Sequence, residues 1–146
     1  MSGKHKARKR FGQNFLTDQK IIDRIIATIA PKRDDNLLEI GPGQGAMTLP
    51  LLEKVEQLNV IEIDRDLIEI LTSYNRSNLV IHQGDALNFD LNLFNPPIRV
   101  VGNLPYNISS PILFHLLENR DKVIDMTFML QKEVVDRMVA DHGSKI

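Results

Sequence analysis

The residues with the clearest chemical potential are Asn103, Leu104, Pro105 and Tyr106, at the end of an apolar stretch. The Asn103 side-chain oxygen and the Pro105 carbonyl are two acceptors that can hold the hydrogens of an exocyclic amine of a nucleobase. Proline suits this place because its fixed φ aims the backbone without side-chain adjustment. Tyr106 adds an aromatic face on which an unstacked base can lie. The four residues therefore predict a catalytic site that presents a base amine.

A second set of residues could hold a cofactor that contains adenosine. Gly41 and Gly43 belong to the stretch GPGQGA, in which glycines let the backbone approach a ligand closely. Glu62 ends the next predicted strand, where a carboxylate can accept both ribose hydroxyls. Asp85 and Ala86 end a third predicted strand, and the Asp85 carboxylate could receive an adenine amino group. These residues alone are compatible with either NAD or S-adenosylmethionine.

The amine-holding residues distinguish these two cofactors. Hydride transfer does not require two hydrogen-bond acceptors beside a stacking ring. Methyl transfer from a sulfonium to an adenine amine does require them. The N6 lone pair is delocalised into the ring, and it becomes more nucleophilic when acceptors hold the N6 hydrogens. Since a sulfonium needs little acid–base help, in-line positioning should supply most of the rate. The pattern favours S-adenosylmethionine over NAD.

The elements that must position these residues alternate along the chain. Strand patterns lie at 36–41, 57–64, 78–85, 98–105 and 123–130. Helix patterns lie at 17–30, 49–55, 66–75, 111–119 and 132–141, and 88–97 is predicted as a loop. Predicted helix-starting residues are Thr17 or Asp18, Asp64, and Ser110 with Pro111. This alternation predicts an α/β, doubly wound parallel sheet whose ligands lie beyond the carboxyl ends of the strands.

The amino-terminal end of the sequence is strongly basic. It holds five of the 18 basic residues of the chain and no acidic residue within its first ten positions: Lys4, Lys6, Arg8, Lys9 and Arg10. The aromatic and amide residues of FGQNFL follow at once, which favours stacking and hydrogen bonding to RNA. We therefore expect residues 1–17 to form an arm and lid that bind RNA, although a solvated tail or an arm docked on its own domain fits the same charges.

Several other properties restrict the class of protein. The 146 residues contain no cysteine, which excludes a disulfide framework and a thiolate nucleophile. The four histidines share no ligand spacing, so no metal site is expected. The basic start lacks the apolar segment of a secretory signal, and no apolar run is long enough to cross a membrane. We expect a cytoplasmic protein with no membrane partner and a single folded domain at 18–146.

Six stretches together resemble the motifs of a known family, in its order and at its spacing. They are RKRFGQNFL (8–16), EIGPGQGAMT (39–48), VIEIDRDL (60–67), GDAL (84–87), GNLPYNISSP (102–111) and FMLQKEVVDRM (128–138). The sequence resembles the ribosomal RNA adenine N6-dimethyltransferases, most closely the bacterial small-subunit (16S) branch, the kasugamycin-resistance methyltransferases. The resemblance implies a Rossmann-like fold with sheet order 3-2-1-4-5 that uses S-adenosylmethionine.

The resemblance also implies a substrate and roles for individual residues. The substrate would be two adjacent adenines in the 3′-terminal hairpin loop of small-subunit rRNA, dimethylated at N6 in the assembling 30S subunit. The cofactor would contact Gln13, Asn14, Leu16, Gly41, Gly43, Glu62, Asp85, Ala86 and Asn103. Asn103 would also hold the reacting amine, and the arm cations would meet rRNA phosphates.

The sequence departs from the family in its length. Family members continue with further strands, a second aromatic motif and a small helical carboxyl-terminal domain. We therefore expect an incomplete methyltransferase domain that binds cofactor better than it catalyses. Two alternatives remain: a non-catalytic rRNA-binding or ribosome-assembly factor, and a large-subunit rRNA adenine methyltransferase, which Pro42 and Leu104 disfavour.

Overall fold

The computed structural model describes residues 18–104 and 106–130. The strands are β1 (Leu37–Ile40), β2 (Leu58–Glu62), β3 (Leu79–Gln83), β4 (Ile98–Leu104) and β5 (Val123–Leu130). The helices are α2 (Gln19–Ile29), α3 (Thr48–Leu52), α4 (Arg65–Ser73) and α5 (Tyr106–Glu118), with the 3₁₀ helices η1 (Leu91–Phe94) and η2 (Arg120–Lys122). The predicted arm at 1–17, the predicted helix at 132–141 and Pro105 lie outside the described residues.

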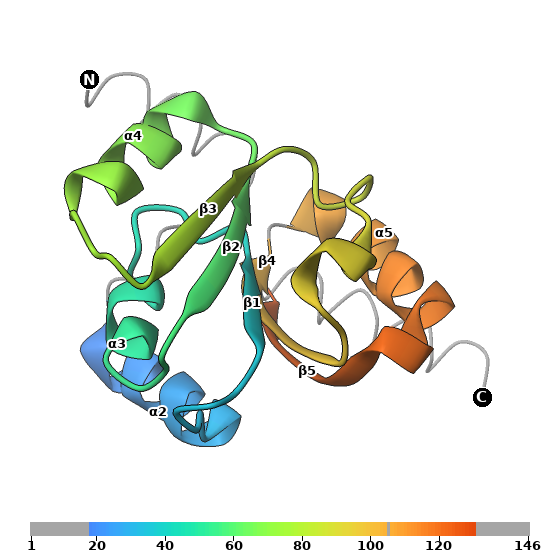
Figure 1. Ribbon diagram of the computed structural model, residues 1–146, viewed down its shortest axis with the longest axis horizontal. Coiled ribbons are helices and arrows are strands. Elements are labelled where there is room, and N and C mark those ends of the chain that lie inside the picture. Colours follow the sequence, from blue (N-terminus) through green and yellow to red (C-terminus); the bar gives the residue numbers. More distant parts are fainter. Residues whose placement is uncertain (1–17, 105, 131–146) are drawn as a thin grey trace.

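The five strands form one sheet in the order β3-β2-β1-β4-β5, and every pair is parallel. This confirms the predicted fold class and strand order. The register places Ile40 opposite Ile61 on one side and Gly102 on the other, while Glu62 lies opposite Gln83. The carboxyl ends of the strands therefore meet at a single edge, which lies at the top of Figure 1.

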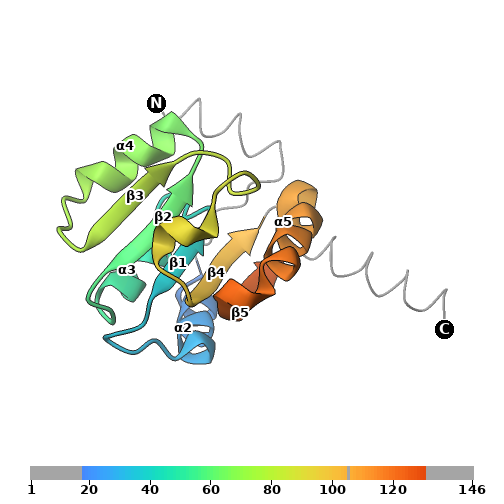
Figure 2. The same ribbon diagram turned by 45° about the vertical axis from the view of Figure 1, so that its right-hand side comes forward.

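Helices cover both faces of the sheet, as the buried character of its strands requires. On one face α2 and α3 bury Ile29, Leu51 and Leu52 against the sheet. On the other face α5 and η1 contribute Ile112 and Phe94 to a second core. Figure 1 shows α2, α3 and α4 on one side of the strands and α5 on the other, and Figure 2 shows the same layers after a turn. None of the described helices is long and apolar enough to span a membrane.

Local sequence explains where two of the helices begin. Asp18 accepts a hydrogen bond from the Lys20 N–H at the start of α2. Asp64 accepts from the N–H groups of Asp66 and Leu67 at the start of α4. Such side chains satisfy amide groups that the first turn of a helix leaves without partners. Both aspartates were expected as caps, and the structure confirms them.

Two expectations about local structure were wrong. Helix α5 begins at Tyr106, so Ser110 is not its cap and Pro111 lies inside it. A proline lacks only one intrahelical N–H, and here that loss falls close to the start of a helix which follows β4 directly. The predicted loop at 88–97 contains η1, because Asp90 accepts from the Asn92 N–H and Leu91 and Phe94 are buried.

Candidate cofactor and catalytic site

The described residues among those predicted to bind the cofactor lie at the carboxyl edge of the sheet, whereas Gln13, Asn14 and Leu16 lie outside the described residues. Backbone hydrogen bonds continue across this edge beyond the strands themselves. The Gly41 N–H donates to the Ile61 carbonyl (3.0 Å), and the Gly84 N–H donates to the Glu62 carbonyl (3.0 Å). The loops that follow β1, β2 and β3 are thereby held beside one another, which brings Gly41, Glu62 and the residues after Gly84 to one place.

The loop after β1 requires glycine for its backbone conformation. Gly41 (φ +64°), Gly43 (φ +61°) and Gly45 (φ +97°) all have left-handed values that disfavour other side chains. A Cβ on Gly41 would meet no atom of the described residues within 4 Å, so these residues leave the backbone there open to an approaching ligand. The Tyr74 hydroxyl donates to the Gln44 carbonyl (2.6 Å) and ties the loop to the end of α4.

Glu62 is buried at the end of β2, with 4% of its surface exposed. Its Oε2 accepts from the N–H groups of Ile63 (3.0 Å) and Asp64 (3.1 Å), and its Oε1 accepts from the Gly43 N–H at 3.4 Å. Burial raises the pKa of Glu62, and the three backbone donors partly oppose that shift. The long contact to Gly43 is the weakest of the three, so Oε1 is the atom best placed to accept a ligand hydroxyl.

Glu39, to which the sequence analysis assigned no role, joins β1 to the start of α3. It is wholly buried in β1, and the Thr48 hydroxyl at the start of α3 donates to its Oε1 (2.6 Å). Burial raises the pKa of Glu39 to about 7, and the nearby Glu62 charge adds to the shift. An acidic residue inside the otherwise apolar stretch LLEI was the signal that could have identified it.

Ile63 was also missed as a candidate binding residue. It follows Glu62 directly, and 63% of its side chain is exposed although most large apolar residues of the chain are buried. An exposed apolar side chain beside the buried Glu62 carboxylate offers van der Waals surface to a planar ring. The signal in the sequence was an isoleucine between two acids that follow a strand.

Asp85 forms a tight turn after β3. Its Oδ1 accepts from the Leu87 N–H (3.0 Å), and its carbonyl accepts from the Asn88 N–H (2.9 Å). These bonds fix the carboxylate relative to the turn. Ala86, the other residue predicted here, packs against the core cluster on the α5 face.

Of the predicted catalytic residues, Asn103 and Leu104 end β4, whereas Pro105 lies outside the described residues. Asn103 is partly exposed, and Gly102 before it allows close packing, since a Cβ there would lie 2.8 Å from the Ile40 carbonyl oxygen. The Leu104 side chain is completely buried in the core, so this residue can contribute to the site only through its backbone. Tyr106 begins α5.

Two further properties of this edge concern metal ligands and ion pairs among the described residues. Within the described ranges, no three His, Asp or Glu side chains are grouped so as to hold a metal ion. No lysine or arginine of those ranges forms an ion pair with Glu39 or Glu62. The site is thus an acid-containing, ligand-accessible edge held mainly by backbone hydrogen bonds.

Fold and site together define a class of protein. A parallel sheet in this order, with a glycine loop after its first strand and an acid after its second, is a Rossmann-like methyltransferase domain. The chain belongs to the ribosomal RNA adenine dimethylase family, whose family model matches residues 4–146.

Relatives of known name support this assignment. The chain is 60% identical over 144 residues to a ribosomal RNA small subunit methyltransferase A from Cupriavidus pinatubonensis strain JMP 134, covering 97% of this chain and 52% of the relative. It is 60% identical over 142 residues to the protein of that name from Aromatoleum aromaticum, covering 97% and 54%. The chain thus spans about half the length of these relatives.

Solved structures of the same fold include two rRNA or adenosine-modifying enzymes. The 23S rRNA methyltransferase ErmE superposes with a TM-score of 0.74 at 32% identity, covering 89% of this chain and 53% of that one. A dimethyladenosine transferase from Plasmodium falciparum superposes with a TM-score of 0.73 at 33% identity, covering 86% and 46%.

Proposed function

We propose that this chain carries the S-adenosylmethionine site and catalytic residues of an adenine N6-dimethyltransferase for small-subunit (16S) rRNA. The observation that carries the proposal is the meeting of the Gly41 loop, Glu62, Asp85 and Asn103 at one edge of the sheet. The names of its relatives from Cupriavidus and Aromatoleum support the same reaction and substrate. Because the substrate is ribosomal RNA, we place the activity in the cytoplasm.

The residues present fit S-adenosylmethionine. Glu62 would accept the ribose hydroxyls, the backbone at Gly41, which is open among the described residues, and at Gly43 would line the methionine end, and Asp85 with Ala86 would receive the adenine. When bound, the cofactor supplies an electrophilic methyl group on a sulfonium. We further propose that Gln13, Asn14 and Leu16 close over it as a lid.

The residues at the end of β4 would orient the reacting adenine. The Asn103 side-chain oxygen and the Pro105 carbonyl accept the N6 hydrogens, and the Tyr106 ring stacks on the base. The N6 nitrogen would then accept the methyl group that the bound cofactor supplies, and the electron pair of the broken carbon–sulfur bond would remain with the sulfur. One N6 hydrogen leaves as a proton to solvent, and the step occurs once for each methyl group.

Recognition of the RNA would be shared between this edge and the arm. We propose that Lys4, Lys6, Arg8, Lys9 and Arg10 contact phosphates of the rRNA in the assembling 30S subunit. Phosphate contacts of this kind position a substrate without reading its sequence. The choice of two adjacent adenines in the 3′-terminal hairpin would then depend on the pocket that holds the base.

A large-subunit rRNA methyltransferase is the second candidate, and the superposition with ErmE favours it. Identity with that protein is 32%, against 60% with the small-subunit enzymes from Cupriavidus and Aromatoleum. The two candidates differ in which RNA receives the methyl group. Offering 30S and 50S subunits separately, with mapping of any dimethyladenosine, distinguishes them.

The proposal is tested by methyl transfer from S-adenosylmethionine to 30S subunits that lack the modification. Asn103→Ala should lower transfer by roughly 100-fold, because a group that aligns the reacting nitrogen is removed, while RNA affinity stays within about twofold. Asn92→Ala, on exposed η1, is the matched control and should retain transfer. A non-catalytic assembly factor would show RNA binding with no transfer by the unaltered chain, and the proposed reaction would then be wrong.

A further inference from the structure

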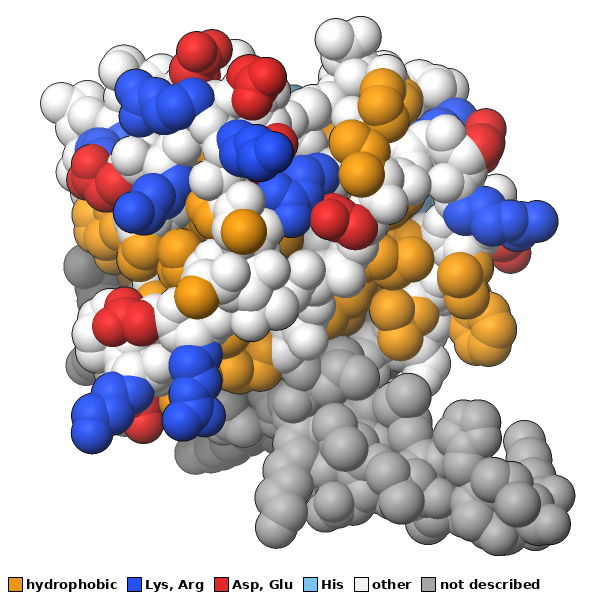
Figure 3. Space-filling view, turned by 90° about the horizontal axis from the view of Figure 1, so that it is seen from below, with side chains coloured by type: hydrophobic (Ala, Val, Ile, Leu, Met, Phe, Trp, Pro, Cys, Tyr) orange, Lys and Arg blue, Asp and Glu red, His pale blue; other side chains and the backbone are white. Residues whose placement is uncertain are grey.

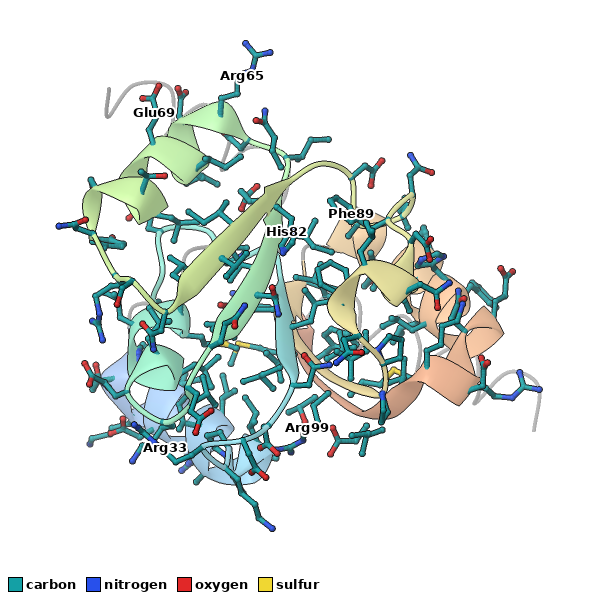
Figure 4. The ribbon with its side chains drawn as sticks, viewed as in Figure 1. Arg33, Arg65, Glu69, His82, Phe89 and Arg99 are labelled. Atoms are coloured by element: carbon teal, nitrogen blue, oxygen red, sulfur yellow. The ribbon has the colours of Figure 1, made fainter. Side chains whose placement is uncertain are left out.

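Three aromatic rings pack together beneath the turn that follows β3. The His82 ring from β3 lies edge-on to Phe94 of η1, with centroids 4.8 Å apart, and edge-on to Phe89 at 6.0 Å. The centroids of Phe89 and Phe94 are 5.9 Å apart. Figure 4 shows His82 and Phe89 on the side of β3 that faces η1. The ring cluster of His82, Phe89 and Phe94 thus fills the space between the edge strand and the segment after it.

Phe89 also contacts the backbone at the start of the Asp85 turn. A Cβ added to Gly84 would lie 2.5 Å from Cε2 of the Phe89 ring and 3.3 Å from its Cζ. The ring therefore occupies the place that a side chain at this position would need. Gly84 directly precedes Asp85, so the ring determines how close the turn can approach the rest of the loop.

The ring cluster is itself held by neighbouring elements. His115 of α5 lies with Nε2 3.3 Å from the Phe89 carbonyl, to which its N–H can donate. The Asn36 side chain, just before β1, donates to the Phe94 carbonyl (2.7 Å). Burial lowers the pKa of His82, whose Nε2 lies 3.0 Å from Asn59 Oδ1, which favours the neutral ring in this cluster. Through these contacts, the positions of α5 and β1 restrict where Phe89 can lie, and Phe89 in turn restricts where the Asp85 turn can lie.

We propose that Phe89 is a positioning residue for recognition of the cofactor's adenine. The inference rests on the proposed function, in which Asp85 receives the adenine amino group. Because Oδ1 of Asp85 is bonded within the turn, the carboxylate moves with the turn and not independently of it. Hydrogen bonds weaken steeply with displacement, so a turn without the ring against Gly84 would lose adenine selectivity before it lost binding.

The test compares two ligands that differ only in the base. S-adenosylhomocysteine has the adenine amino group, whereas S-inosylhomocysteine has a carbonyl in its place. Calorimetry with the whole chain gives the ratio of their dissociation constants. We expect the unaltered chain to prefer the adenosyl compound and Phe89→Ala to reduce that preference by roughly threefold to tenfold, the value of one hydrogen bond. Phe89→Leu, which retains apolar volume without a ring, should do the same if Phe89→Ala fails to fold.

A second arm of the experiment uses the contact with Gly84. Gly84→Ala should reduce the preference more in the unaltered background, where its Cβ collides with the ring, than in the Phe89→Ala background, where only the backbone strain at φ +158° remains. Phe114→Ala on α5, where 67% of the side chain is exposed, is the control and should leave the ratio unchanged.

The outcomes separate this inference from the proposed function. An unaltered ratio in Phe89→Ala or Phe89→Leu, with both ligands still bound, overturns the inference alone. An equal effect of Gly84→Ala in both backgrounds also overturns it. Failure of the unaltered chain to bind either compound contradicts the proposed function and, with it, the inference.

Discussion

At the amino ends of the strands, largely buried charged side chains form ion pairs. At the carboxyl ends, the buried acidic side chains instead accept hydrogen bonds from uncharged donors. Arg99, on β4, donates through Nε to Asp125 (3.0 Å) and through Nη1 to Asp35 (2.7 Å). Its guanidinium also donates to the Ile29 carbonyl at the end of α2. Figure 4 places Arg99 at the opposite end of the sheet from Arg65, and Figure 3 shows acidic and basic side chains interspersed on this lower side.

The two settings shift carboxyl groups in opposite directions. Burial alone would raise the pKa of Asp35, but a backbone hydrogen bond from Lys32 and the Arg99 guanidinium outweigh it and lower the pKa. Burial raises the pKa of Glu39 to about 7, with only the Thr48 hydroxyl in opposition. Charged side chains at the amino ends of the strands hold elements together, whereas the buried acids at the carboxyl ends accept hydrogen bonds from uncharged groups.

Removing the cation should have the largest effect. Arg99→Met should destabilise the chain by about 3–4 kcal/mol, because Asp35 and the Ile29 carbonyl lose their donor in a largely buried place and the half-exposed Asp125 also loses its partner. Urea unfolding measures the change. Arg76→Met, which breaks a more exposed ion pair with Glu53, is the control and should cost less than about 1 kcal/mol. Equal losses in the two variants would show that burial does not distinguish the two ion pairs.

The next effect should be a pH dependence at the carboxyl end. The folded pKa of Glu39, about 7, lies above the unfolded value of 4.5, so folding favours its protonated form. Its stabilising contribution is complete below about pH 4.5 and is lost as the pH rises through about 7, by on the order of 2–3 kcal/mol. Unfolding free energies measured across this range should therefore fall more steeply for the unaltered chain than for Glu39→Gln. Parallel curves would contradict the assignment.

A smaller effect is expected on ligand affinity. Glu62→Gln should weaken S-adenosylmethionine binding by roughly tenfold, about 1.4 kcal/mol, because a charged acceptor for ribose hydroxyls becomes neutral. Calorimetry measures the change. Glu69→Gln on the exposed face of α4 is the matched control and should bind normally (Figure 4). Unchanged affinity in Glu62→Gln would place the ribose elsewhere.

The smallest effect on stability is expected for Asp35, near the amino ends of the strands, and it should disappear at acid pH. The folded pKa of Asp35 lies below 3.8, so its contribution is present above that value and is lost as the pH falls through the folded pKa. Asp35→Asn should remove only about 0.5–1 kcal/mol at neutral pH, because the asparagine oxygen can still accept from Arg99 and only the charge is lost, and it should flatten the acid limb of the stability curve. If the stability of the variant fell more steeply than that of the unaltered chain at acid pH, the predicted direction of the pH dependence would be wrong. The two ends of the sheet would then no longer differ in the direction of their pH dependence.

Local physical chemistry allowed most of the fold to be predicted from sequence. Alternating apolar stretches predicted β1 to β5, whereas their order was implied by the family resemblance. Asp64, and Asp18 as an alternative to Thr17, were expected as helix caps. The glycine loop at Gly41 and the acid at Glu62 were also expected at strand ends. These features depend on neighbouring residues, whose spacing and conformational preferences can be read along the chain.

Only the tertiary structure decided the features that join distant residues. The pairing of Arg99 with Asp35 and Asp125, the burial of Glu39 and the contact of Phe89 with Gly84 all depend on which elements lie side by side. The start of α5 at Tyr106, ahead of Pro111, likewise differs from the local signal. The reason is physical: burial, pKa and steric contact are properties of the packed chain, and no local pattern specifies which side chains will share one interior space.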